Sequence, residues 1–262
     1  MTTAASATPS IRPISHPSTN DKVFALVAGL LRPASRVVDI GAGEGYFSMM
    51  VGDEVSRRFG VAPDQVVSAC DVFPALFRYP AVRCDQIHDE GRLPYDDGVF
   101  DIACSLEVVE HVEDQFRFAR EIYRVLRPGG IAIISTPNVL NMNSRLRQLH
   151  SGFGVLFDPL LLSSTDPVHT SGHINPVSYY YLAYQLRRAG FTSVEPHYDR
   201  FKTSAMLLLA ICGAFVLVGN ALFRARLRRK RPQVEVENQS LLAAMNSREM
   251  LTSRSVIAVA TK

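Results

Sequence analysis

Glycine alternates with other residues where an apolar run ends, and this arrangement suits the binding of a nucleotide-like ligand. Asp39 lies within the apolar run 37–40, and Gly41, Gly43 and Gly45 follow at every second position. Glycine tolerates backbone conformations that other residues avoid, and its missing side chain lets a ligand contact the backbone. The dehydrogenase pattern G-x-G-x-x-G would need a glycine where this chain next has a tyrosine. We therefore expect another kind of small-molecule site at the end of a first strand.

Ionisable side chains form a second group further along the chain. Glu107, Glu110 and His111 would share one face of a helix, so two carboxylates and an imidazole could converge on a divalent cation. His169 and His173 lie in a later loop. A neutral imidazole near pH 7 suits removal of a hydroxyl proton, so His173, His111 and His169 are candidate general bases. The alternative for each histidine is a structural or solvated side chain.

The elements that must position these residues alternate between strands and helices. Short β-branched runs predict strands, and apolar residues at helical spacing predict helices between them. This alternation predicts an α/β fold with a doubly wound, mostly parallel, seven-stranded sheet. The expected strands are 37–40, 66–70, 81–84, 100–105, 131–135, 193–198 and 255–262, and the expected helices are 21–31, 46–51, 113–126 and 178–189.

The glycine loop and the blocks that follow it resemble class I S-adenosylmethionine (SAM) methyltransferases. The sequence G-x-G-x-G after a strand with an acid is similar to their motif I, and the segments LPYDDGVFD, LEVVEHV and STPN are similar to later motifs. The resemblance is to type 11/23-like members, among them ubiquinone-biosynthesis O-methyltransferases and methyltransferases of glycans and lipids. It implies a Rossmann-like fold, an enzyme and SAM as the cofactor.

The resemblance also implies roles for individual residues. The backbone at Gly41, Ala42 and Gly43 would contact the amino-acid part of SAM, Asp39 would orient its ammonium group, and Asp71 would accept both ribose hydroxyls. Asp85, or Asp89 as the alternative, would face the adenine. The implied cofactor-binding set is Asp39, Gly41, Ala42, Gly43, Gly45, Asp71, Val72, Asp85, Ser105 and Glu107.

The resemblance leaves the cation question open. The resemblance to ubiquinone-biosynthesis O-methyltransferases would make Glu107, Glu110 and His111 a divalent-cation site. In metal-free relatives, the histidine of this block packs under the SAM site instead. The acceptor is expected at the loops from Thr136 to His173, because these follow the carboxyl ends of the strands.

Composition limits the partners and the compartment. The 262 residues carry a net charge of +3, too small to argue for nucleic acid as a partner. Four cysteines show no C-x-x-C pair, which favours reduced thiols and a cytoplasmic setting. Residues 1–20 lack a basic segment followed by an apolar one, so a flexible tail is expected and not a signal peptide.

An apolar run, 205–223, interrupts the α/β pattern and is followed by a basic run, 224–231. We expect a methyltransferase domain at 21–200, a membrane-associating insertion at 201–254 and the last strand at 255–262. The polar residues after the basic run cannot form a second span. The expected protein is therefore peripheral or monotopic, held against anionic lipid on the inner face of the cytoplasmic membrane. A dimer interface or a pocket lid is the alternative.

These features predict a SAM-dependent methyltransferase that O-methylates a lipid-linked or amphipathic acceptor at the membrane surface. One alternative keeps the reaction but uses a soluble sugar or small metabolite, with the apolar run as a dimer interface. A second alternative is a non-catalytic SAM-binding protein recruited to membranes.

Overall fold

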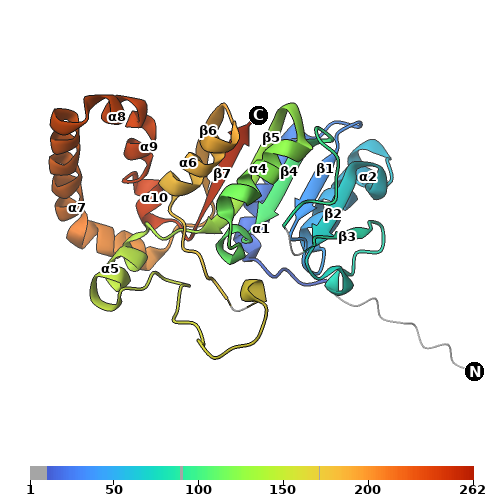
Figure 1. Cartoon of the computed structure of the whole chain (residues 1–262), viewed down its shortest axis with the longest axis horizontal. Coiled ribbons are helices and arrows are strands. Elements are labelled where there is room, and N and C mark those ends of the chain that lie inside the picture. The colour runs from blue at the N-terminus through green and yellow to red at the C-terminus, as the bar shows by residue number, and fades with distance from the viewer. Residues whose placement is uncertain (1–10, 89–90, 171) are drawn as a thin grey trace, which may run out of the picture.

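A single seven-stranded sheet organises the chain. The computed structural model describes residues 11–88, 91–170 and 172–262, and the side chain of His169 is also outside this description. The strand order is β3-β2-β1-β4-β5-β7-β6. Figure 1 shows the sheet with β3 at one edge and β6 at the other. The strands are β1 (Val37–Ile40), β2 (Val67–Asp71), β3 (Cys84–Gln86), β4 (Phe100–Leu106), β5 (Leu126–Pro137), β6 (Ser193–Tyr198) and β7 (Ser255–Thr261).

Helices cover both faces of the sheet, so each face has its own apolar core. One core joins the sheet to α1 and α2 through residues such as Val27 and Val51. The other joins it to α4 and α6 through residues such as Ile122 and Leu182. The predicted α/β, doubly wound fold is therefore confirmed. The helices of these layers are α1 (Pro17–Leu30), α2 (Tyr46–Phe59), α3 (Pro63–Val66), α4 (Gln115–Val125) and α6 (Tyr179–Ala189), and the short 3₁₀ turns are η1 (Pro74–Leu76), η2 (Val109–His111) and η3 (Val168–Thr170).

The last strand completes the sheet as the sequence predicted. β7 runs antiparallel between β5 and β6, while β1 to β5 pair in parallel. Parallel strands end at the same edge, so the loops after β1, β2, β4 and β5 meet there. This edge carries the residues singled out for cofactor and acceptor.

Several boundaries differ from the sequence prediction; for example, β3 is expected at 81–84 and is formed by Cys84–Gln86. β5 begins at Leu126, five residues before the expected start at Ile131, because Leu126 already pairs with Phe100 across an irregularity in the register. The expected flexible tail is also shorter than predicted, since α1 begins at Pro17 and Asn20 is buried. Residues 1–10 of that tail lie outside the described residues.

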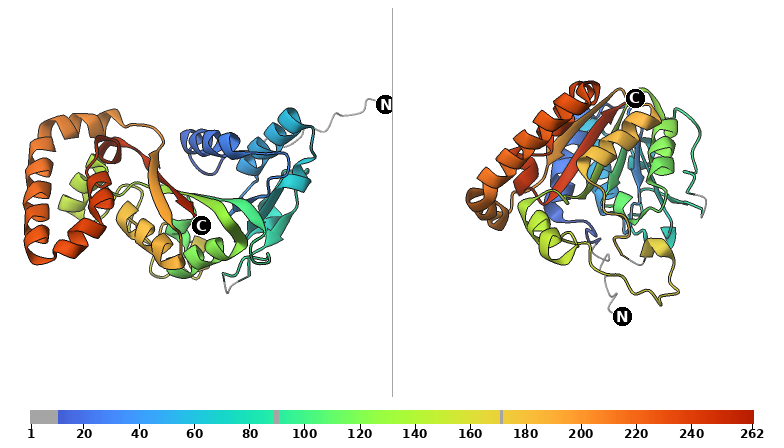
Figure 2. Two further views of the ribbon diagram at one scale, coloured as in Figure 1. Left: turned by 90° about the horizontal axis from the view of Figure 1, so that it is seen from above. Right: turned by 60° about the vertical axis from the view of Figure 1, so that its left-hand side comes forward.

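The apolar insertion forms an arm that leaves the sheet and returns to it. It contains α7 (Thr203–Lys230), α8 (Pro232–Glu237), α9 (Gln239–Ala244) and α10 (Arg248–Thr252). Figures 1 and 2 show the arm projecting beyond the β6 edge, beside α5 (Met142–Ser151). Its two ends are joined, because Lys202 N donates to Thr252 O at 2.8 Å and Phe201 bridges Ser253.

Candidate active site

The glycine loop after β1 needs glycine for both conformation and space. Gly41, Gly43 and Gly45 have φ values of 76°, 53° and 89°, which other residues rarely adopt. A Cβ on Gly41 would lie 2.5 Å from Val108 Cγ2, and one on Gly45 would lie 2.7 Å from the Phe77 ring. The backbone of this loop is therefore closely surrounded, and a side chain at these positions would displace its neighbours.

Asp71 ties the end of β2 to the glycine loop. Its Oδ2 accepts a hydrogen bond from Gly43 N and its Oδ1 accepts one from Phe73 N, each at 2.8 Å. The side chain is 8% exposed. A carboxylate has about four acceptor positions, so each oxygen keeps capacity for a hydroxyl. The site thus offers two adjacent acceptors at the point where β1 and β2 end.

Asp39 lies beneath the loop, 3% exposed, and its Oδ2 accepts a hydrogen bond from Ser48 Oγ at 2.7 Å. Burial raises the pKa of Asp39 to about 6, and the negative charge of Asp71 contributes to the rise while Ser48 opposes it. A cationic group bound nearby would favour the ionised carboxylate. Asp39 is therefore suited to an ammonium ligand.

The segment before α1 covers the glycine loop, which the sequence did not indicate. Ile14 Cδ1 lies 2.5 Å from where a Cβ on Gly43 would stand. Arg12 N donates to Glu44 Oε2 at 3.2 Å, which holds the same segment against the loop. Ile14 stands between Pro13 and Pro17 in a stretch without a helical or strand pattern, so only the fold shows this contact.

The other predicted cofactor residues lie around the same sheet edge. Asp85 is on β3 opposite Cys70, and its Oδ1 is 3.1 Å from Arg83 Nε. The carbonyl of Val72 accepts a hydrogen bond from Gln86 Nε2 at 2.7 Å. Ser105 Oγ, near the end of β4, is buried and has no hydrogen-bond partner among the described residues. Asp89, the alternative to Asp85, lies outside the described residues.

Glu107 points away from the group in which the sequence placed it. It precedes η2 with a positive φ of 53°, so the expected helical face shared with Glu110 does not form. Its Oε1 accepts hydrogen bonds from Arg254 and from Ser255 Oγ, the latter at 3.0 Å. The predicted cation set of Glu107, Glu110 and His111 therefore needs correction, because Glu107 is committed to an ion pair beside β7.

Glu110 is fully buried next to the end of β5. Its Oε2 accepts a hydrogen bond from Thr136 Oγ1 at 3.0 Å, whereas Oε1 has no partner within the described part of the chain. Burial raises the pKa of Glu110 to about 8, and the charge of Glu107 adds to the rise while Thr136 opposes it. An unsatisfied buried carboxyl oxygen is costly unless a ligand or ion meets it.

His173 takes the place predicted for Glu107 in this cluster. The ligand atoms of Glu110, His111 and His173 lie within 4.8 Å of one another. His111 Nδ1 is 2.9 Å from the carbonyl oxygen of Gly172, which must accept, so the hydrogen of a neutral ring is on Nδ1. His173 Nδ1 is buried without a hydrogen-bond partner among the described residues. His169 lies in η3, and its side chain is outside the described part.

This cluster can perform either of two tasks. One carboxylate and two imidazoles form a ligand set that suits transition metals better than the oxygen-preferring Mg²⁺ or Ca²⁺. Without a metal, the unpartnered nitrogen of His173 can accept a proton from a hydroxyl group. The ring of Phe157 packs 5.2 Å from that of His173 and helps to fix its orientation.

Comparison with known proteins shows the family to which the chain belongs. Residues 17–195, more than half of the chain, match the family described as "Methyltransferase domain". The chain belongs to this methyltransferase family. The predicted fold, enzyme class and SAM cofactor are thereby confirmed for the methyltransferase domain.

Relatives named as methyltransferases match part of this methyltransferase. A "Probable S-adenosylmethionine-dependent methyltransferase" of Mycolicibacterium smegmatis is 38% identical over 103 residues, which cover 39% of this chain and 38% of the relative. One of Mycobacterium tuberculosis is 35% identical over 105 residues, which cover 40% of this chain and 36% of the relative. The matched segments thus span less than half of either relative.

Solved structures share the fold of this methyltransferase over nearly its whole length. A SAM-dependent methyltransferase from Archaeoglobus fulgidus has a TM-score of 0.52 and 16% identity, covering 93% of this chain and 94% of that one. The [4+2]-cyclase SpnF has a TM-score of 0.51 and 20% identity, covering 92% and 81%. At such identities the likeness shows the fold alone, since one fold hosts several reactions.

Proposed function

We propose that the protein transfers the methyl group of SAM to a hydroxyl of a lipid-linked or amphipathic acceptor at a membrane surface. The observation that carries the membrane part is α7, an apolar helix that leaves most of its surface uncovered next to the acceptor side of the sheet.

The residues proposed to hold SAM lie around the point where β1 and β2 end. The Gly41–Ala42–Gly43 backbone would contact its amino-acid part, Asp39 its ammonium group and Asp71 its ribose. Gly45, Val72, Asp85, Ser105 and Glu107 would complete the set, and the unpartnered Ser105 Oγ supports a polar ligand there. SAM supplies an activated methyl group, so the protein must align the acceptor, exclude water and remove the acceptor's proton.

SAM binding is expected to weaken in acid because of Asp39. In the free protein this carboxyl, with its pKa raised to about 6, is protonated below that pH and cannot pair with an ammonium group. Affinity should fall about tenfold for each pH unit below 6 and be constant from pH 7 to 8. Calorimetric titration with S-adenosylhomocysteine from pH 5 to 8 measures this. The same slope in Asp39→Asn would assign it to another group.

The acceptor side centres on His173, with Glu110 and His111 beside it. We propose His173 as the general base, because its buried Nδ1 has no partner among the described residues and faces a polar cluster. His111 and His169 remain further candidates for the base. A divalent cation held by Glu110, His111 and His173 is the alternative way to activate a hydroxyl.

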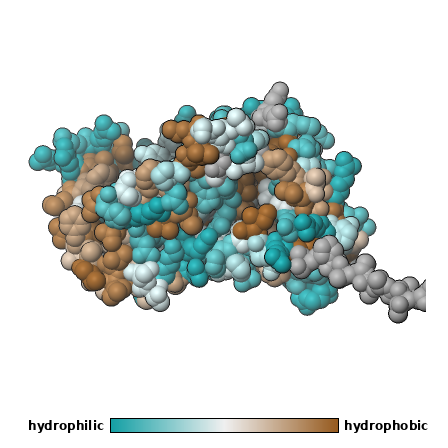
Figure 3. Space-filling view, turned by 90° about the horizontal axis from the view of Figure 1, so that it is seen from below, coloured by the Kyte–Doolittle hydropathy of each residue, from teal (hydrophilic) through white to brown (hydrophobic). Residues whose placement is uncertain are grey.

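α7 has the length and composition of a membrane-bound helix. It is the one described helix that is long and apolar enough to cross a membrane, with a mean hydropathy of 2.4 and only 6% of the apolar window buried. Figure 3 shows hydrophobic side chains gathered on the end of the molecule that α7 forms. Leu207, Ile211, Val218 and Leu222 lie on one face of the helix and are 63%, 69%, 59% and 67% exposed. A surface of this kind favours an apolar environment.

The closure of the arm favours a helix that lies in the interface over one that crosses the bilayer. Both ends of the arm return to the same point of the sheet, where Lys202 meets Thr252. A crossing by α7 would require polar residues 232–254 to cross back. We propose a methyltransferase domain at 21–200 with its last strand at 255–262, and a monotopic insertion at 201–254.

Basic residues at the end of α7 favour an anionic surface. Arg224 is paired with Glu235, but the following basic side chains are exposed, and each can contribute about 1 kcal/mol near anionic lipid. These exposed residues are Arg226, Arg228, Arg229, Lys230 and Arg231. They support a position on the inner face of the cytoplasmic membrane.

Polar substitution of the outer face of α7 is expected to release the protein from vesicles. With Leu207, Ile211, Val218 and Leu222 all changed to Gln, binding to phosphatidylglycerol vesicles should fall by at least about 100-fold, because each buried apolar side chain contributes about 1.5–3 kcal/mol. Flotation of the full chain with vesicles measures this.

The matched control changes Leu161 and Leu162 to Gln, which are 75% and 99% exposed but lie outside the arm. That variant should float like the wild type. The membrane proposal would be contradicted if the wild type did not bind vesicles and eluted as a dimer, while the quadruple variant eluted as a monomer. The outer face of α7 would then be a dimer interface, and a soluble acceptor would be favoured.

A further inference from the structure

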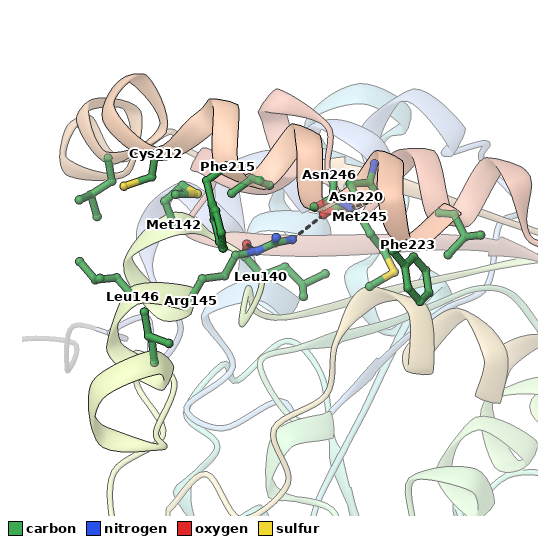
Figure 4. Close-up of a pocket in the computed structure, with 15 residues that line it drawn as sticks. Leu140, Met142, Arg145, Leu146, Cys212, Phe215, Asn220, Phe223, Met245 and Asn246 are labelled. Atoms are coloured by element: carbon green, nitrogen blue, oxygen red, sulfur yellow. Dashed lines mark hydrogen bonds between the residues drawn. The ribbon is translucent and has the colours of Figure 1, made fainter. Parts of the chain in front are cut away.

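An apolar cavity of about 630 Å³ lies between α5 and α7, and no step proposed so far uses it. All but three of its lining residues are apolar. Figure 4 shows Met142 and Leu146 on one side, with Cys212 and Phe215 of α7 on the other. The volume is within the range of about 300–1,000 Å³ that small-molecule sites occupy. A predominantly apolar lining of this kind suits a hydrocarbon chain.

One corner of the cavity is polar and carries a positive charge. Arg145 donates from Nε to Leu140 O at 2.7 Å and from a terminal nitrogen to Met245 O at 3.0 Å. Asn246 and Asn220, which are hydrogen-bonded to each other at 3.1 Å, lie at the same end. Burial lowers the pKa of Arg145.

Arg145 has only neutral partners around this corner. Its two hydrogen bonds go to carbonyl groups, and no carboxylate of the described residues forms an ion pair with it. A partly buried guanidinium without a counter-charge gains from an anionic ligand, and arginine matches the geometry of phosphate and carboxylate. The corner is therefore complementary to an anionic group.

The cavity begins where the acceptor side of the sheet ends. Thr136, near the end of β5, bonds to Glu110 in the proposed acceptor cluster. Four residues later Leu140 lines the cavity, and its carbonyl holds Arg145. The segment 136–140 thus connects the cluster to the cavity.

We propose that this cavity binds the hydrocarbon chain of the methyl acceptor itself, with Arg145 pairing with an anionic group between chain and headgroup. The inference rests on the amphipathic acceptor of the proposed function and specifies its chemistry as a long-chain anionic amphiphile. Its test is separate, because flotation reports the outer face of α7 whereas the cavity is reported by Cys212, which lines it.

Protection of Cys212 from N-ethylmaleimide, followed by peptide mass spectrometry on the full chain without vesicles, tests the proposal. Decyl phosphate below its micellar concentration should slow alkylation of Cys212 at least tenfold at saturation. Octyl phosphate should need about 15-fold more ligand for the same effect, since each methylene is expected to change affinity about fourfold. Decanol should bind about tenfold more weakly, and inorganic phosphate alone should not protect.

Gly219 provides a variant that fills the cavity without removing any contact. It lines the cavity, and an added Cβ would meet no atom within 4 Å. Gly219→Leu should therefore weaken decyl phosphate at least tenfold, while Leu217→Phe, which adds volume on a part of α7 outside the cavity, should not. Arg145→Met should abolish the preference for decyl phosphate over decanol, and Arg145→Lys should restore part of it.

Three results would overturn the proposal. Protection unaffected by Gly219→Leu would place the ligand elsewhere. Equal protection by decanol and decyl phosphate would show that the cavity does not recognise an anionic group. If phosphatidylglycerol vesicles alone protected Cys212 fully, and added decyl phosphate did not displace the lipid, the occupant of the cavity would be a membrane lipid and not the acceptor.

Discussion

Asp71→Ala is expected to weaken the binding of SAM by about 100-fold or more. In the proposed complex this carboxylate accepts two ribose hydroxyls, and each hydrogen bond to a charged group contributes about 1.5–3 kcal/mol. Losing both would cost at least about 3 kcal/mol, which corresponds to a factor above 100 in affinity. Calorimetric titration of the purified variant with SAM at pH 7.5 measures the loss.

Two further variants separate recognition from loop structure in this experiment. Asp71 also holds the backbone at Gly43 and Phe73, so its removal can loosen the glycine loop. Asp71→Asn keeps one carbonyl oxygen as an acceptor and should bind SAM more tightly than the alanine variant does. Asp64→Ala removes an exposed acid on α3 and should leave affinity unchanged. Wild-type affinity in Asp71→Ala would contradict the ribose assignment.

The first strand and the glycine turn after it were predictable because their signals are local. Val37, Val38 and Ile40 around Asp39 specify a buried strand, and alternating glycines specify the turn after it. The positions of the remaining strands along the chain followed from apolar runs separated by segments with helical spacing. Each of these signals lies within a few consecutive residues, where sequence periodicity carries information about backbone conformation.

The acceptor side was less predictable because it depends on contacts between distant residues. His173 joins Glu110 and His111 only after about 60 residues of chain fold back, and Gly172 then bonds to His111. Glu107 is removed from the cluster by Arg254, which lies 147 positions later. Helical spacing places Glu107 beside Glu110, but an ion pair near β7 and a positive φ override that spacing.

The same reasoning applies to the apolar arm. The run 205–223 predicts an unusual helix. The cavity beside this helix could not be predicted, because it forms only where α5 and α9 pack next to α7. Arg145 lies within the loops from Thr136 to His173 where the acceptor was expected, but no sequence pattern assigned it an anionic ligand, since an arginine on a helix is usually solvated. Its proposed role in binding an anionic group depends on its burial beside α7 and on its two carbonyl partners, Leu140 and Met245.

His173→Ala is expected to lower kcat for methyl transfer by about 100- to 10,000-fold while SAM affinity stays unchanged. This is the usual contribution of a positioned general base. A labelled-methyl assay with a lipid extract of the producing organism measures transfer, and titration with SAM measures the donor side. Added imidazole should restore part of the activity if the missing group is a base. His150→Ala, on exposed α5, is the control and should keep wild-type activity.

Glu110→Gln distinguishes the base from the cation in the same assay. With a pKa raised to about 8, Glu110 is largely a neutral carboxyl at pH 7 when no cation is bound, and glutamine imitates that state in size and polarity.

If His173 acts as the base, Glu110→Gln should change kcat by less than about tenfold, and a chelator should have no effect on the wild type. If a cation is held by Glu110, His111 and His173, the glutamine removes a charged ligand, so activity should fall as far as in His173→Ala and a chelator should abolish it in the wild type. Imidazole rescue of His173→Ala together with chelator resistance would establish the base, because a metal site lacking one ligand would remain sensitive to the chelator.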